Sequence, residues 1–150
     1  MSSNSTYIYE TYIRAPAERV WQALTSAEFT CQYFHATHVE STWEQGAPIR
    51  YKYAPDGDVA VEGEVLEAQP PNKLAITWHV LYNEDAARET PSRVTFEIET
   101  LDQQTRLRIV HDRFAEGSVV LPEISQGWPW ILSSLKSLLE TGEALPPATA

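Results

Sequence analysis

Four histidines are the side chains of this chain best suited to acid–base or metal chemistry. His35 and His38 lie three residues apart, and Glu40 follows closely. A zinc site would need a third and a fourth ligand in suitable geometry, but the remaining histidines, His79 and His111, fall on separate predicted strands. We therefore interpret His35 and His38 as surface residues and expect no metal site.

The single cysteine, Cys31, cannot form a disulfide within the chain. It lies four residues before His35, a spacing that a helix could close, although that spacing alone is weak evidence for an activated thiol. The chain has no G-x-S-x-G sequence, no phosphate-binding loop and no dinucleotide fingerprint. We expect no cofactor, and we interpret Cys31 as a small buried apolar residue.

His111 is the histidine with the clearest potential for function. If its strand stays regular, it continues the inward-facing series of Leu107 and Ile109. There it could contact a polar group of a ligand or serve as an acid or base. Equally, it could form a hydrogen bond with a neighbouring backbone group, and the sequence leaves these alternatives open.

Aromatic side chains indicate a second kind of chemistry, the binding of a ligand. Tyrosine and tryptophan combine apolar area with one polar atom, which orients a ligand in an apolar pocket. We predict a ligand site lined by Tyr33, Tyr51, Tyr53, Val61, Trp78, Phe96, His111, Trp128, Leu132 and Leu135. The alternative is that these large side chains fill the interior completely.

Residues 124–142 predict the helix that positions part of this set. Its apolar residues recur at spacings of three and four, namely Trp128, Ile131, Leu132, Leu135, Leu138 and Leu139. Trp128 and Trp130 lie about 200° apart around a helix, so we expect Trp128 to face the core and Trp130 to cover an edge, a loop or a partner subunit. Pro129 must lie in the first turn or kink the helix, and Gly142 ends it.

The remaining elements follow from the period of the apolar residues. Proline at 16 suits the start of a helix, and alternation with a period of two predicts strands. We predict a strand over 6–14, short helices over 15–26 and 27–34, and strands over 38–43, 49–54, 59–68, 74–80, 92–100 and 105–114. Residues 82–91 are polar and read as a long mobile loop, and we expect residues 1–6 and the last residues to be loose.

This order predicts an α+β fold. Hairpin-length links make the sheet antiparallel, and only one long helix is available to cover its apolar face. We therefore expect a helix-grip arrangement, in which a curved antiparallel sheet of about six or seven strands wraps around the long C-terminal helix, with two short helices after the first strand. A curved sheet touches a helix along a line, so a cavity remains unless bulky side chains fill it.

Several segments resemble the SRPBCC superfamily, the START and pollen-allergen-like proteins. These segments are "APAERVWQALT", the Trp43, Gly46, Pro48 and Tyr51 set, "GEVLEAQPPNKLAITW" and "GWPWILSSLKSLLETG". Within the superfamily the chain is similar to the branch named after the activator of the heat shock protein 90 ATPase. The resemblance spans residues 7–142 and implies a single SRPBCC-like domain over 1–150 with a deep hydrophobic pocket. The resemblance implies no catalytic residue, because we identify no catalytic motif common to this branch.

Composition excludes some partners and favours one location. The formal net charge of −10 repels nucleic acid phosphates and anionic membrane surfaces. No apolar run reaches the roughly 20 residues that cross a bilayer, so we expect no membrane insertion. The first residues, MSSNST, do not read as a secretory signal, and we expect a cytoplasmic protein.

These observations favour a binding protein over an enzyme. Our first hypothesis is that the chain binds a small hydrophobic or aromatic molecule between the sheet and the C-terminal helix. The alternative is an enzyme of the polyketide cyclase or hydrolase type that uses His111. The family name implies a further alternative, co-regulation of a chaperone ATPase, and a homodimer is possible.

Overall fold

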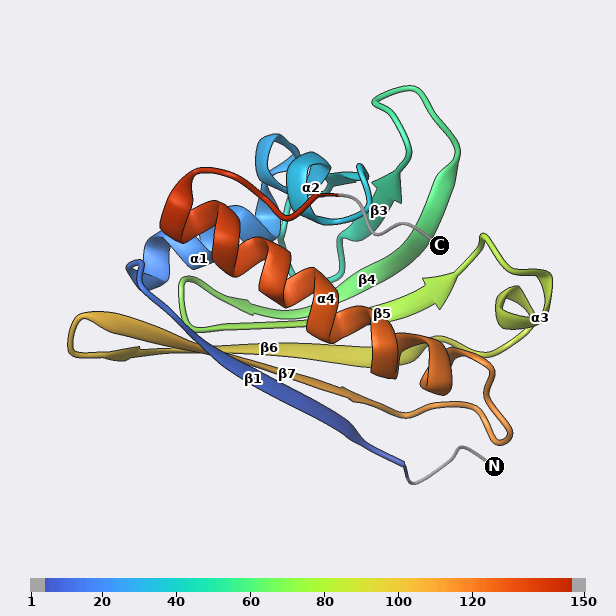
Figure 1. The fold of residues 1–150 in the computed structure, drawn as a ribbon. Coiled ribbons are helices and arrows are strands. Elements are labelled where there is room, and N and C mark those ends of the chain that lie inside the picture. The colour runs from blue at the N-terminus through green and yellow to red at the C-terminus, as the bar shows by residue number, and fades with distance from the viewer. Residues whose placement is uncertain (1–4, 147–150) are drawn as a thin grey trace.

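Seven antiparallel strands form one sheet in the order β1-β7-β6-β5-β4-β3-β2, and a long helix crosses its concave face (Figure 1). The computed structural model describes residues 5–146, so the ends expected to be loose lie partly outside the described residues. The strands are β1 (Tyr7–Ile13), β2 (His38–Glu40), β3 (Pro48–Lys52), β4 (Val59–Gln69), β5 (Lys73–Val80), β6 (Ser92–Leu101) and β7 (Gln104–Asp112). The helices are α1 (Ala17–Thr25), α2 (Ala27–Tyr33), α3 (Glu84–Ala87) and α4 (Val120–Thr141). The predicted α+β helix-grip fold is confirmed.

The period of two in the sequence sets the two faces of the sheet. In β7, Leu107, Ile109 and His111 are fully buried, while the residues between them are partly exposed. On the outer face, Arg93 of β6 forms a paired contact with Asp112 of β7, with Nε at 2.9 Å and one terminal nitrogen at 2.6 Å from the carboxylate. The apolar face therefore belongs to the interior, and the ion pairs stay on the outside.

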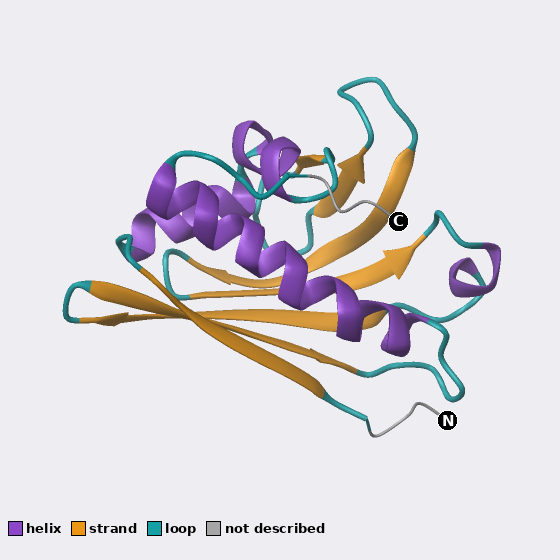
Figure 2. Cartoon of the chain, viewed as in Figure 1, coloured by secondary structure: helices purple, strands orange, loops and turns teal. Residues whose placement is uncertain are grey.

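The bend of the sheet arises in β4, where the pairing is irregular. The register shifts between Tyr51 and Lys52 on β3, and again between Val65 and Glu67 on β4. Such irregularities bend a strand and increase its twist. Gly63 lies between them and approaches β5 so closely that a Cβ atom there would meet the Thr77 carbonyl oxygen at 1.9 Å. As a result β3 and β4 bend away from the flatter strands, toward the side of the sheet that carries α4 and α2 (Figure 2).

Helix α4 buries one stripe along its whole length. The buried residues are Val120, Ile124, Trp128, Ile131, Leu132, Ser134, Leu135 and Leu138. The helix begins at Val120, so Pro129 lies inside it and not in the first turn, the first of the two alternatives expected for this residue. The second alternative, a kink at Pro129, stays a prediction. A proline there leaves the carbonyl of Ser125 without its usual backbone donor. Gly142 ends the helix as predicted, in the left-handed conformation with φ 87°.

The start of α4 is fixed by Ser118, just before the helix, and by Glu89, which is about 30 residues away in the sequence. The Ser118 hydroxyl accepts hydrogen bonds from the backbone N–H groups of Val120 and Leu121, at 3.0 and 3.4 Å. Glu89, in the loop after α3, accepts from the Ser118 hydroxyl at 2.6 Å and from the Val119 N–H at 2.8 Å. A carboxylate is favourable at the N-terminus of a helix, so this contact ties the β5–β6 connection to α4.

The connection between β5 and β6 is more ordered than expected. Residues 82–91 were predicted to be a long mobile loop, but they contain α3. The Asn83 side chain caps this short helix by accepting from the N–H groups of Asp85 and Ala86, at 2.9 and 3.1 Å.

Among residues 5–146, no helix is long and apolar enough to cross a membrane.

We expect Gly63→Ala to lower the free energy of unfolding by about 2 kcal/mol, because the new Cβ would press on the backbone of β5 rather than on a movable side chain. Urea unfolding of the two proteins measures this difference. Gly127→Ala is the control, because its Cβ would meet only the Ile131 side chain, at 4.0 Å. An unfolding midpoint of Gly63→Ala equal to that of the wild type would contradict the close approach.

Candidate functional site

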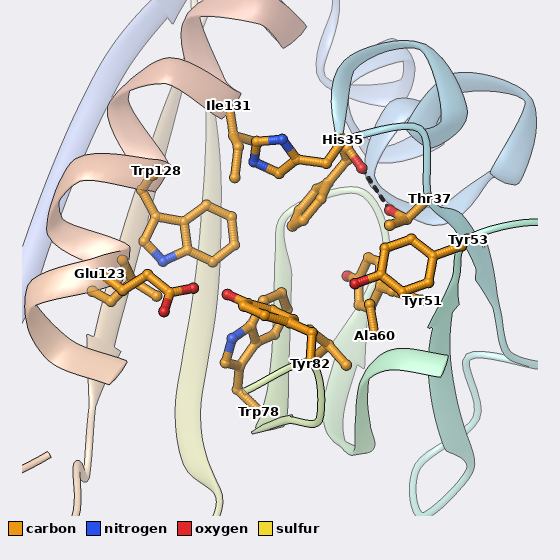
Figure 3. A pocket seen from close by; sticks show the side chains of 14 residues that line it. His35, Thr37, Tyr51, Tyr53, Ala60, Trp78, Tyr82, Glu123, Trp128 and Ile131 are labelled. Atoms are coloured by element: carbon orange, nitrogen blue, oxygen red, sulfur yellow. Dashed lines mark hydrogen bonds between the residues drawn. The ribbon is translucent and has the colours of Figure 1, made fainter. Parts of the chain in front are cut away.

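A cavity of about 330 Å³ opens between the N-terminal half of α4 and the strongly bent part of the sheet (Figure 3). This volume is at the lower end of the range of small-molecule sites, about 300–1,000 Å³. Its walls come from α4, from β3 to β5 and from the loops after α2, β3 and β5. The lining residues are Phe34, His35, Thr37, Tyr51, Tyr53, Ala60, Val61, Trp78, Tyr82, Glu123, Ile124, Gly127, Trp128 and Ile131.

Four buried aromatic rings form one continuous wall of the cavity. Phe34 lies 5.1 Å from Tyr51 and 5.7 Å from Trp128 between ring centroids, and Trp78 lies 5.3 Å from both Tyr51 and Trp128. These separations are typical of offset or edge-to-face aromatic pairs. The rings support one another, so we expect the wall to keep its shape when the cavity is empty.

Trp128 is held in place by a chain of buried hydrogen bonds. Its indole N–H donates to Nδ1 of His111 at 3.1 Å. Nε2 of His111 lies 2.7 Å from the Ser92 hydroxyl, which donates to the Trp78 carbonyl at 3.3 Å. All three bonds are satisfied when His111 is neutral with its proton on Nε2.

The surroundings of His111 keep it neutral. The ring is fully buried and stacks on Phe114, with centroids 4.5 Å apart. Burial lowers the pKa of His111 from 6.5 to about 3, and the neighbouring Asp112 offsets this only in part. His111 therefore accepts one hydrogen bond and donates another within the core, and its imidazole ring is uncharged at neutral pH.

One polar atom of the wall is left without a partner among the described residues. Nε1 of Trp78 is buried and makes no hydrogen bond with any of residues 5–146, which costs about 1–3 kcal/mol for an unsatisfied buried group. Burial raises the pKa of the Tyr51 hydroxyl, so this group keeps its proton at neutral pH and can donate. Trp78 and Tyr51 both line the cavity, so a ligand can supply the partner that the Trp78 indole lacks.

The mouth of the cavity carries tyrosines and one carboxylate. Tyr53 and Tyr82 are about half exposed, at 50% and 51%. Glu123, on the first turn of α4, is exposed, and partial desolvation raises the pKa of its carboxyl. Figure 3 shows the Tyr82 hydroxyl and the Glu123 carboxylate turned toward each other across the opening.

The loop after α2 closes another side of the mouth. His35 and Ala36 both have positive φ, at 51° and 59°, which turns the chain back sharply after Phe34. The His35 ring stacks on Trp130 with centroids 5.3 Å apart. Trp130 was expected to cover an edge, a loop or a partner subunit, and in the structure it covers the loop that carries His35.

Half of the predicted ligand-binding residues lie on the cavity wall: Tyr51, Tyr53, Val61, Trp78 and Trp128. Their contact with a ligand stays a prediction. The other half, Tyr33, Phe96, His111, Leu132 and Leu135, do not line the cavity.

The residues off the cavity have structural partners instead. The Tyr33 hydroxyl donates to the Ala23 carbonyl of α1 at 2.8 Å, and the Phe96 ring packs edge-on against Trp128 at 6.0 Å. Leu132 and Leu135 lie further along α4 and are almost completely buried. His111 lies behind Trp128. The interior around Leu132 and Leu135 is therefore filled, and the cavity lies beside the N-terminal half of α4.

Sequence reasoning missed several lining residues: Phe34, His35, Thr37, Ala60, Tyr82, Glu123, Ile124, Gly127 and Ile131. A signal existed for those on α4, because positions 124, 127, 128 and 131 share one helix face. Phe34, His35 and Tyr82 lie in connections, where the period of the apolar residues gives no direction.

The remaining candidates for chemistry do not assemble into a site. Within residues 5–146, no three histidine, cysteine, aspartate or glutamate side chains gather where a metal ion could bind. His35 is exposed and His38 is half-buried. Cys31 is only partly buried, contrary to its interpretation as a buried apolar residue, and its thiol points to the Glu28 carbonyl at 3.5 Å.

Comparison with known proteins matches residues 14–140 to the family described as Activator of Hsp90 ATPase homolog 1-like protein. No match was found among curated proteins.

Solved structures share the fold. The protein MLL2253 from Mesorhizobium loti is 27% identical with a TM-score of 0.76, and the match covers 91% of this chain and 97% of that chain. The Aha1 dimer from Colwellia psychrerythraea is 21% identical with a TM-score of 0.75, covering 93% and 99%. PFC0360w, an HSP90 activator from Plasmodium falciparum, is 19% identical with a TM-score of 0.70, covering 89% and 95%.

We expect His111→Gln to flatten the dependence of stability on pH. In the unfolded chain His111 binds a proton below about pH 6.5, whereas in the folded chain it binds one only near pH 3. Acidification between these values therefore favours the unfolded chain and lowers the free energy of unfolding. This contribution amounts to about 2 kcal/mol between pH 6.5 and pH 5. Glutamine can keep hydrogen bonds to Trp128 and Ser92 but does not titrate.

Urea unfolding of the wild type and His111→Gln at pH 7 and pH 5 measures the effect. The variant should lose less stability on acidification than the wild type, even if it is less stable at pH 7. An equal loss in both proteins would show that the pKa of His111 is not lowered in the folded state.

Proposed function

The chain belongs to the Activator of Hsp90 ATPase homolog 1-like protein family, and we propose that it binds a small hydrophobic or aromatic molecule in the cavity between the bent sheet and α4. The observation that carries this proposal is the aromatic wall of Phe34, Tyr51, Trp78 and Trp128 around a space of about 330 Å³. A core that only stabilised the fold would gain by closing this space, because interiors pack densely. The open volume therefore supports a binding role.

The position of His111 argues against the cyclase or hydrolase alternative. A general acid or base must reach the reacting atoms within hydrogen-bond distance, directly or through one water. Both ring nitrogens of His111 are occupied by Trp128 and Ser92, and the residue does not line the cavity. We assign His111 to the support of Trp128.

Co-regulation of a chaperone ATPase remains a second candidate, favoured by the family name. An ATPase assay of heat shock protein 90 with increasing amounts of this chain tests this role, and an ATPase rate unchanged at saturating concentration would exclude it.

A homodimer stays a prediction as well; the similar Colwellia psychrerythraea structure is a dimer. Light scattering across a concentration series measures the oligomeric state.

Ligand binding is tested by thermal shift and by tryptophan fluorescence with a panel of naphthalene, flavonoid and fatty acid compounds. Trp78 and Trp128 are part of the wall, so a ligand in the cavity changes their emission. We expect Gly127→Leu to weaken binding at least about tenfold, because the new side chain grows from α4 into the cavity. The variant should stay folded, since leucine has a higher helix propensity than glycine by about 0.8 kcal/mol.

Gln126→Leu is the matched control, because it adds the same side chain at an exposed position of the same turn. It should bind as the wild type does. Equal affinity of Gly127→Leu and wild type would place the ligand outside the cavity and overturn the proposal.

A further inference from the structure

The hydrogen-bonding groups of the cavity carry information on the ligand beyond its apolar character. Trp78 is 5% exposed, and its Nε1–H has no acceptor within the part of the chain that the structure describes. An indole nitrogen can only donate. The group that satisfies it must therefore be an acceptor, such as a carbonyl oxygen, and a hydrocarbon ligand would leave it unpaired.

The charges around the cavity disfavour an anionic ligand. Among the described residues, no lysine or arginine lines the cavity, whereas Glu123 lies at its mouth. The chain as a whole carries a formal charge of −10. A carboxylate or phosphate entering the cavity would lose its hydration without gaining a cationic partner, and the negative field would repel it.

The arrangement of Tyr82 suggests how the N–H becomes accessible. Figure 3 shows the nitrogen edge of Trp78 turned to the space between Tyr82 and Glu123. Tyr82 is half exposed and lies in the connection after β5, so its side chain can rotate without disturbing the sheet. Rotation of Tyr82 outward would let a ligand carbonyl reach Nε1, and Glu123 could then accept from a hydroxyl at the outer end of the ligand.

We infer that the ligand is an uncharged, compact aromatic molecule with a carbonyl or similar acceptor, which receives a hydrogen bond from the Trp78 indole N–H. The inference rests on the proposed binding function and adds the chemical class of the ligand. The aromatic wall binds the ring system, and the indole selects the acceptor. A site built to form a buried hydrogen bond discriminates against an analogue that lacks the partner.

Three probes of similar size test this class: naphthyl methyl ketone, ethylnaphthalene and naphthoate. Their dissociation constants are measured by tryptophan fluorescence with the wild type, Trp78→Phe and Gly127→Leu. We expect the wild type to bind the ketone about tenfold more tightly than the hydrocarbon, as one net hydrogen bond provides, and naphthoate more weakly than both. Trp78→Phe keeps an aromatic ring but removes the N–H, so it should bind ketone and hydrocarbon equally.

A second measurement needs no variant. In a nitrogen-15 NMR spectrum of the wild type, the Trp78 indole N–H signal should shift downfield with the ketone and not with the hydrocarbon. Equal affinity for ketone and hydrocarbon, or tighter binding of naphthoate, would overturn the inference while the binding function stands. Absence of binding for all three, or binding that Gly127→Leu leaves unchanged, would overturn both.

Discussion

The hydrogen bond from Trp128 to His111 is the interaction on which the cavity depends. It fixes a ring that is 1% exposed between α4 and the sheet. Phe34 and Trp78 pack on this ring from the cavity side, and Phe96 packs on it from the sheet. The ring is held on the wall and cannot turn into the open volume. Leu132 and Leu135 fill the interior further along α4, whereas Ile124, Gly127 and Ile131 border the cavity beside Trp128.

The sequence predicted the fold well because its signals are local. Alternation over residues 105–111 predicted a strand with His111 facing inward, and β7 has this arrangement. The fold errors concern features that depend on single capping side chains. Asn83 turns part of a polar stretch into α3, and Ser118 with Glu89 starts α4 earlier than its apolar stripe near Pro129 indicated.

The site was harder to predict, because alternation along a strand gives the direction of each side chain but not the residues that it contacts. His111 and Phe96 point inward as expected, yet Trp128 separates them from the cavity. Phe34 lies on the wall because the chain reverses at His35 and Ala36, two residues with positive φ. No period in the sequence predicts that reversal. Residues on regular elements could thus be assigned to the interior, but not to its filled or open part.

The contact of Glu89 with the start of α4 has a consequence for exchange between the cavity and bulk solvent. The carboxylate joins the connection that carries Tyr82 to the helix turn that carries Glu123. These two hydrogen bonds join the two sides of the mouth and oppose a lid-like movement of either one. Passage is left to rotation of the half-exposed tyrosine rings, which occurs in picoseconds to nanoseconds for exposed side chains. Free and occupied forms should then share one backbone conformation, and the rate of arrival should follow diffusion rather than a slow opening step.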